Sequence, residues 1–250
     1  MTKFVVLSLF PEMFELFINT SIIKRAINNK IIDVDLIDIR DFATNKNKKV
    51  DYSPYGGGNG MVIMCEPLDL ALKYAIKKID SNNYKIIYLS PRGNLLDYSL
   101  VNKLSNQIDN YILICGHYEG IDERIIQKYN ITEISIGDYV LTGGELPAMV
   151  LIDAISRLKP GVLSKGSLEQ ESHTNILLEY PQYTKPNVFD GYNVPEVLLD
   201  GNHQKIDKYR KEEAIYTTYT NRPDLLKKAI KQKVISKEDI EKIIKERKVK

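Results

Sequence analysis

Apolar segments of strand length alternate with amphipathic segments of helix length through residues 1–160, and this alternation constrains the fold most strongly. Such alternation favours an α/β fold, in which helices cover both faces of a parallel sheet. The predicted strands are Phe4–Phe10, Ile31–Ile39, Lys85–Ser90, Tyr111–Gly116 and Thr132–Ile136. The predicted helices are Glu12–Ile18, Ser21–Asn28, Pro67–Ile79, Asp97–Leu104, Asp122–Tyr129 and Glu145–Leu158.

The pattern changes at Lys159-Pro160-Gly161, because proline cannot continue a helix and glycine commonly ends one. The polar stretch Ser164–Asn175 is expected to be a linker or a mobile loop. We therefore predict a first domain over residues 1–160, a flexible linker over 161–176 and a small helical domain over 177–250. Its predicted helices are His203–Thr220, Pro223–Lys231 and Ser236–Arg247, the last opened by a capping box of Ser236 and Asp239.

The composition is that of an ordinary globular protein, with 43% hydrophobic and 27% charged residues among 250. No run approaches the roughly 18 apolar residues of a membrane helix, and the N-terminus lacks a signal-peptide pattern. Cys65 and Cys115 have no C-x-x-C spacing. A disulfide framework and a zinc site are therefore not expected, and the predicted location is the cytoplasm, without membrane association.

The net charge of +2 is unevenly distributed along the chain. Residues 201–250 hold 15 Lys and Arg against 8 Asp and Glu, a balance of +7, whereas the rest of the chain carries −5. A basic tail on an acidic body predicts contact with a polyanion. A lysine-rich, solvated helix face is the alternative that charge alone leaves open.

The first of three glycine-bearing loops is Pro54–Met61. It lacks the Lys-Ser/Thr of a P-loop, and its glycines do not fit G-x-G-x-x-G, so it does not indicate nucleoside triphosphate binding. Its glycines would let the backbone approach a ligand closely, or they mark a flexible turn.

The other two loops, Cys115–Arg124 and Ser135–Pro147, each leave an apolar strand and enter a helix. Ligands of open parallel sheets bind at the carboxyl ends of strands, so we expect a ligand near the loops after Ser90, Gly116 and Ile136. The last loop suits a flat apolar group such as an adenine. The three histidines, which show no metal-ligand spacing and are expected to be non-catalytic, are His117, His173 and His203.

Together the motifs resemble the bacterial tRNA (guanine-37-N1)-methyltransferases of the knotted SPOUT class. The resemblance covers nearly the whole chain, and its strength lies in the number of motifs in one order. The motifs are Leu9–Phe14, Arg40–Phe42, Pro54–Met61, Tyr88–Pro91, Gly116–Arg124, Ser135–Met149, Glu179–Thr184, Gly201–His203 and Arg222-Pro223.

The resemblance implies a deep trefoil knot in the N-terminal α/β domain, whose loops hold S-adenosylmethionine. It also implies a homodimer in which the partner subunit completes each site, and assistance by Mg²⁺ near Glu119. The positions that match the family's cofactor-binding residues are Tyr88, Leu89, Ser90, Pro91, Gly116, Tyr118, Glu119, Ile136, Gly137, Asp138, Tyr139, Val140, Leu141, Gly143 and Gly144.

The implied reaction needs two further groups. Guanine N1 carries a proton at neutral pH, so a carboxylate base is required, and the charge that moves onto O6 calls for a fixed guanidinium. The family's arginine matches Arg157. The family's base is an aspartate followed by serine; counting back from Tyr180-Pro181 gives Glu171, and counting forward from Gly161–Leu163 gives Ser172. Because the reaction needs a carboxylate, we predict Glu171.

The basic C-terminal helices are expected to bind the tRNA phosphates through Lys205, Lys208, Arg210, Lys211 and Arg222. One alternative is a related knotted methyltransferase that acts on a ribose 2′-hydroxyl or on ribosomal RNA. Another is an RNA-binding relative without catalysis, which the missing aspartate favours.

Overall fold

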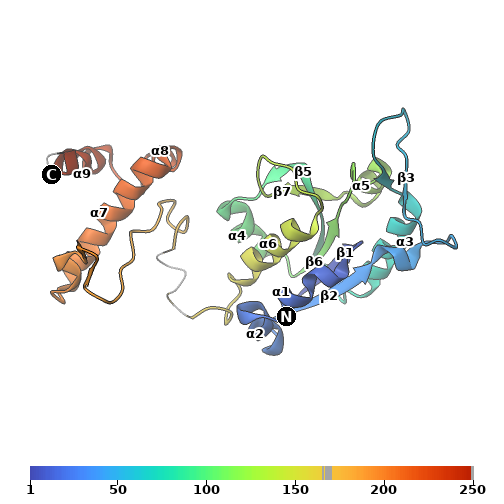
Figure 1. The fold of residues 1–250 in the computed structure, drawn as a ribbon, viewed down its shortest axis with the longest axis horizontal. Helices are drawn as coiled ribbons and strands as arrows, with labels where there is room; N and C mark the ends of the chain where they lie inside the picture. The colour runs from blue at the N-terminus through green and yellow to red at the C-terminus, as the bar shows by residue number, and fades with distance from the viewer. Residues whose placement is uncertain (165, 167–170, 249–250) are drawn as a thin grey trace. The chain divides into compact units, whose positions relative to one another are not determined.

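The computed structural model describes residues 1–164, 166 and 171–248, and the chain divides into two compact units, Met1–Ser164 and Lys165–Lys250 (Figure 1). Residues 165 and 167–170, which belong to the predicted linker, lie outside the described residues. Among the described residues, no helix combines the length and the apolar character needed to cross a bilayer.

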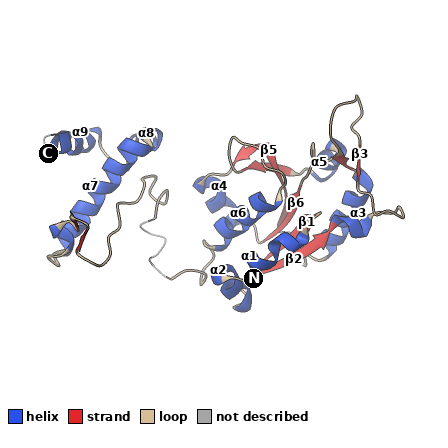
Figure 2. Cartoon of the chain, viewed as in Figure 1, coloured by secondary structure: helices blue, strands red, loops and turns tan. Residues whose placement is uncertain are grey.

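Unit 1 is built on a five-stranded parallel sheet with the order β2-β1-β6-β5-β7 (Figure 2). The predicted parallel sheet is thus confirmed, and most strand boundaries differ by one or two residues from the prediction. The strands are β1 (Thr2–Ser8), β2 (Ile32–Asp38), β5 (Tyr84–Leu95), β6 (Asn110–Cys115) and β7 (Thr132–Ser135).

Helices cover both faces of this sheet, because successive strand residues point to opposite sides. Val5 and Leu7 of β1 pack in a core with α3 and α5, whereas Phe4 and Val6 pack in a second core with α2, α4 and α6. The helical elements are η1 (Pro11–Phe14), α1 (Glu15–Ile18), α2 (Ser21–Asn28), η2 (Ile39–Phe42), α3 (Cys65–Lys77), α4 (Tyr98–Gln107), α5 (Glu123–Tyr129) and α6 (Glu145–Ser156).

Three local features of unit 1 depart from the prediction. The helix expected at Glu12 begins as a 3-10 turn at Pro11. A short hairpin, β3 (Asp51–Tyr52) and β4 (Val62–Ile63), brackets the first glycine loop. Strand β5 continues past Ser90 to Leu95, with a register shift against β7 between Leu89 and Asn94. These features lie in the segments that follow β1 and β2 and at the end of β5.

Unit 2 is mainly helical, with α7 (His203–Asn221), α8 (Pro223–Lys231) and α9 (Lys237–Lys248). It also contains η3 (Glu196–Leu198) and a hairpin of β8 (Val188–Phe189) and β9 (Tyr192–Asn193). The Ser236 hydroxyl accepts a hydrogen bond from the Asp239 N–H at 3.0 Å, as the predicted cap requires. A small core holds the unit together and contains Ile215, Leu226, Ala229, Ile235, Ile240 and Ile243.

Candidate active site

A pocket of about 200 Å³ opens on the carboxyl-end side of β5, β6 and β7. It lies between residues 88–92 of β5 and the loops that follow β6 and β7. Every residue of the predicted cofactor set lines it except Asp138. The lining residues outside the predicted cofactor set are Arg92, His117, Gly120, Ile121, Ile134, Ser135, Thr142 and Pro147.

Close backbone packing explains three glycines of the pocket. A Cβ on Gly116 would lie 2.6 Å from the Tyr88 ring, and one on Gly144 would lie 2.7 Å from the Cα of Cys115. A Cβ on Gly143 would lie 2.4 Å from the His117 ring. The Gly144 N–H donates to the Gly116 carbonyl at 2.9 Å. The loops after β6 and β7 therefore touch directly, and a side chain at these positions would separate them.

The loop after β7 presents apolar side chains to solvent. Val140 is 81% exposed, and Tyr139 and Leu141 are exposed beside it. The turn is fixed from within, because the Tyr139 N–H donates to the Gly137 carbonyl at 2.9 Å and the Ser135 hydroxyl donates to the same carbonyl. This loop is therefore an ordered apolar surface available for a ligand or a second chain.

The first glycine loop reaches the pocket at its C-terminal end. The Glu119 N–H donates to the Met61 carbonyl at 3.0 Å, and a Cβ on Gly60 would lie 2.6 Å from a Glu119 carboxylate oxygen. Tyr118 has φ of +57°, an uncommon conformation for a residue with a side chain. The Pro54–Met61 loop thus packs against the pocket rim at Glu119.

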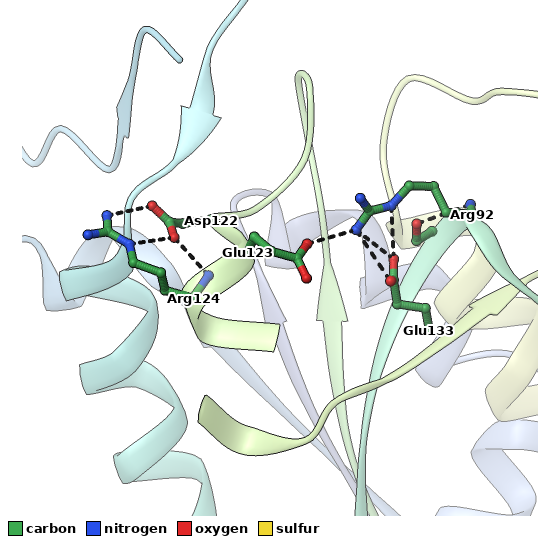
Figure 3. A network of polar contacts seen from close by, with 6 residues as sticks. Arg92, Asp122, Glu123, Arg124 and Glu133 are labelled. Carbon is green, nitrogen blue, oxygen red and sulfur yellow. Dashed lines mark hydrogen bonds and ion pairs between the residues drawn. The ribbon is translucent and has the colours of Figure 1, made fainter. Parts of the chain in front are cut away.

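Figure 3 shows two ion-pair groups, of which the first includes the pocket-lining residue Arg92. Arg92, which lines the pocket, contacts Glu123 at 3.3 Å and Glu133 at 3.2 Å, and these carboxylates raise the pKa of its guanidinium. Arg124 binds Asp122 through two nitrogens, and its hydrogen bonds hold the pKa of Asp122 well below the usual range. These contacts fix the charged side chains at the rim in place.

A buried polar chain lies directly behind the pocket. Glu145, at the start of α6 and 1% exposed, accepts a hydrogen bond from the Ser8 hydroxyl at 2.6 Å. Its other oxygen lies 2.8 Å from Nε2 of His117. Burial raises the pKa of the neighbouring Cys115 thiol, and the Glu145 charge raises it further. Neither Ser8 nor Glu145 was among the predicted site residues, and no motif spacing connects them.

The two predicted catalytic residues belong to different units. Arg157 is the C-cap of α6, half-buried, with its N–H bonded to the Asp153 carbonyl. Glu171 opens a turn in which the Thr174 N–H donates to the Glu171 carbonyl at 3.3 Å. The Ser172 hydroxyl accepts from the Glu179 N–H at 3.0 Å. Ser172, the other residue considered for the position of the family's aspartate, thus caps a backbone N–H.

The predicted RNA-binding residues fall into two groups. Lys205, Lys208 and Lys211 are exposed and spaced three residues apart on α7, so they follow one side of the helix. The Arg210 guanidinium instead packs 4.9 Å from the Tyr180 ring centre. Arg222 pairs with Asp224 at 2.7 Å and lowers the pKa of that carboxyl to about 2.

Over the described ranges 1–164, 166 and 171–248, no three side chains of His, Cys, Asp or Glu gather in an arrangement that could hold a metal ion.

Comparison with known proteins identifies the family. Residues 2–228 match the family described as tRNA (Guanine-1)-methyltransferase TrmD. A tRNA (guanine-N(1)-)-methyltransferase from Ruminiclostridium cellulolyticum is 55% identical over 227 residues, covering 90% of this chain and 97% of that protein. Proteins with the same name from Clostridioides difficile and Malacoplasma penetrans are 53% and 50% identical, each over more than 90% of both chains. The chain belongs to the tRNA (Guanine-1)-methyltransferase TrmD family.

Proposed function

We propose that the protein transfers a methyl group from S-adenosylmethionine to N1 of guanosine-37 in tRNA, next to the anticodon. The observation that carries the proposal is the pocket at the carboxyl ends of β5, β6 and β7, in a chain of this family. The relatives' names supply the substrate class and the target atom. S-adenosylmethionine as the methyl donor and position 37 as the target are not part of those names and are proposed here in addition.

The pocket lining fits an adenosine with a charged tail. The glycines Gly116, Gly143 and Gly144 let the segments that line the pocket pack closely together around it. Apolar side chains such as Leu89 and Leu141 suit the base, while backbone amides and carbonyls suit its polar edge. When bound, S-adenosylmethionine supplies an electrophilic methyl group.

Glu171 is the proposed general base that removes the proton from guanine N1. The chemistry requires a carboxylate, and Glu171 is the carboxylate at the position that matches the family's aspartate. The longer glutamate changes the reach of the base by one methylene, which the turn that Glu171 opens has to accommodate.

Arg157 is the proposed partner of guanine O6, where negative charge accumulates as N1 loses its proton. A half-buried guanidinium stabilises such charge better than an exposed one, because solvent screens it less. Arg157 caps the C-terminus of α6, the helix whose N-terminal end adjoins the pocket.

Lys205, Lys208 and Lys211 are proposed to bind the phosphates of the anticodon stem. Arg222 and Arg210 are included in the proposed set with their charges already engaged by Asp224 and Tyr180.

The proposal extends to the fold and the assembly. A trefoil knot is proposed because the family resemblance implies one in this domain. A homodimer is supported by exposed apolar side chains on the contacting elements η1 and α6, such as Met13, Leu146 and Val150. Sedimentation equilibrium of the full chain tests the dimer. The proposed location is the cytoplasm, where tRNA is modified.

Assistance by Mg²⁺ is also proposed, with Glu119 as the contributing side chain. Glu119 is the one carboxylate among the described pocket-lining residues, so ligand and water oxygens would have to complete the coordination. Assays with and without a chelator test this requirement.

The decisive experiment measures methyl transfer from labelled S-adenosylmethionine to a tRNA transcript with guanosine at position 37. A transcript with adenosine at that position is the control. Transfer to the first transcript alone, with the label mapped to N1, establishes the reaction and its target. Label on a ribose would favour a related methyltransferase, and cofactor binding without transfer would favour a non-catalytic RNA-binding relative.

A further inference from the structure

The buried polar chain of Ser8, Glu145 and His117 joins three segments that the pocket needs. Ser8 ends β1, His117 lies in the loop after β6, and Glu145 begins α6 directly after the Gly143-Gly144 loop. Because β1 and β6 are neighbours in the sheet, the Ser8 and His117 segments leave the same edge side by side. This buried polar chain of three side chains therefore connects both pocket loops to the centre of the sheet.

The contacts leave Glu145 with one well-defined arrangement. A carboxylate only accepts hydrogen bonds, so Ser8 donates to one oxygen and the Nε2 proton of His117 is directed at the other. Ser8 also accepts from the Phe10 N–H at 2.8 Å, which fixes the hydroxyl as the donor to Glu145. Glu145 is 1% exposed, and a buried carboxylate without partners is strongly unfavourable.

His117 is held from a second side by two motifs that line no part of the pocket. The edge of its ring meets the Phe10 ring at 4.9 Å between centres and 62° between planes. The Arg40 guanidinium covers Phe10 at 4.9 Å and also donates to the Leu9 carbonyl. The Leu9–Phe14 and Arg40–Phe42 motifs thus support His117 from behind, although neither motif contributes a residue to the pocket lining.

The position of His117 sets the separation of the two loops. Its ring occupies the space where a Gly143 Cβ would lie, and its backbone forms a bridge with Gly143. A tilt of the ring toward Gly143 would push the Thr142–Gly144 segment away from Gly116. The geometry of the pocket therefore depends on the hydrogen bond between Glu145 and His117.

We propose that Glu145, braced by Ser8, is a positioning residue that orients His117 and thereby holds the two pocket loops in the arrangement that binds the cofactor. The inference rests on the proposed use of this pocket for S-adenosylmethionine.

The test compares Glu145→Gln, which keeps the side-chain size but removes the charge and one acceptor, with wild type. The Kd for S-adenosylmethionine, measured by calorimetry, is expected to rise about tenfold. This corresponds to the free energy of one buried hydrogen bond to a charged group. At saturating cofactor, kcat and the KM for tRNA are expected to stay within about twofold, because Glu171, Arg157 and the α7 lysines are unchanged. Hydrogen exchange is expected to accelerate in residues 116–120 and 137–144 and to remain slow in α3.

Asp69→Asn is the matched control. It removes another paired carboxylate of unit 1, one bound to Lys73, Lys128 and Tyr129 outside the pocket lining. It is expected to lower the thermal midpoint without changing the cofactor Kd. If the role of Glu145 were purely structural, Glu145→Gln would lower the thermal midpoint without changing the cofactor Kd, as expected for Asp69→Asn. Hydrogen exchange would then rise throughout the sheet, and this outcome would overturn the inference.

Two further variants keep the inference testable if Glu145→Gln does not fold. Ser8→Ala removes the hydrogen bond to Glu145 and the one accepted from the Phe10 N–H, and it is expected to raise the cofactor Kd about threefold. His117→Ala is expected to raise it about tenfold, and adding Ser8→Ala to it is expected to have less than a twofold further effect. An unchanged Kd in these variants overturns the inference alone, whereas a wild-type chain that binds no S-adenosylmethionine overturns the proposed function with it.

Discussion

The two units build their candidate sites in opposite ways. In unit 1 the pocket consists of loops packed so closely that Gly116, Gly143 and Gly144 have no room for a Cβ. In unit 2 the candidate RNA-binding side chains are exposed lysines on α7, above a core of few residues. Small changes in unit 1 should therefore act through geometry and be severe, whereas changes in unit 2 should act through charge and be graded. Glu171 is the exception, as a chemical group located in unit 2.

Substitution of Glu171 is expected to have the largest effect on activity. Glu171→Gln is expected to lower kcat at least 100-fold, because an amide cannot remove the N1 proton. The cofactor Kd should not change, since the pocket lies in unit 1. Single-turnover methyl transfer and calorimetry measure the two quantities. Ser172→Ala is the control and should keep most activity; equal activity in both variants would remove Glu171 from the mechanism.

Gly144→Ala comes next, with an expected weakening of cofactor binding of about 100-fold, since the backbone of Cys115 or Gly144 must move. Gly191→Ala in unit 2 is the counterpart, because its added Cβ meets nothing within 4 Å and only its φ of +82° is strained. It is expected to cost about 1 kcal/mol of folding stability. Calorimetry and thermal melts on both variants test the comparison; similar behaviour would contradict it.

Replacing Lys205, Lys208 and Lys211 together by glutamine is expected to weaken tRNA binding about tenfold near physiological salt and to flatten its salt dependence. Filter binding at several salt concentrations provides the measurement. The control replaces Lys24, Lys77 and Lys103, exposed lysines of unit 1, and removes the same charge. Equal losses in the two triple variants would show that net charge, rather than the α7 surface, governs binding.

The smallest effect concerns stability and pH. Burial alone would raise the pKa of Asp69, but hydrogen bonds from Lys128, Lys73 and Tyr129 lower it well below the usual range. The stabilisation is therefore present above the unfolded pKa of about 3.9 and is lost as the pH falls below it. Asp69→Asn is expected to cost about 1 kcal/mol at pH 7 and much less near pH 2. Denaturant melts at both pH values measure the difference.

Asp224→Asn is the unit 2 counterpart, and its exposed pairing with Arg222 should leave the melt unchanged. A loss of stability comparable to that of Asp69→Asn would contradict the distinction between the units.

The sequence predicted most of the fold because its main elements are long and periodic. β1 and β6 are continuous apolar runs, and α8 begins and ends at the predicted residues. The two short hairpins escaped prediction because two-residue strands have no measurable period. The extension of β5 past Ser90 was also missed, because proline and glycine are uncommon inside a strand, whereas Gly93 permits close contact with β7.

The location of the pocket followed from the rule that parallel strands bind ligands at their carboxyl ends. What lies behind the pocket did not follow, because Ser8 and Glu145 are 137 residues apart and no pattern links them. Charge counting likewise could not show which cations are paired, such as Lys208 with Glu212 at 3.8 Å and Arg222 with Asp224 at 2.7 Å. Local patterns thus predicted the elements and the sheet edge, but not the tertiary contacts.

The last helix has a consequence for how this chain can change during evolution. The family match ends at residue 228, before α9 begins, yet α9 supplies Ile240 and Ile243 to the core of unit 2. Selection on α9 should therefore act on its buried stripe, while its outward residues are free to drift. A protein shortened to the matched region would keep every pocket residue and lose the support beneath the lysines of α7.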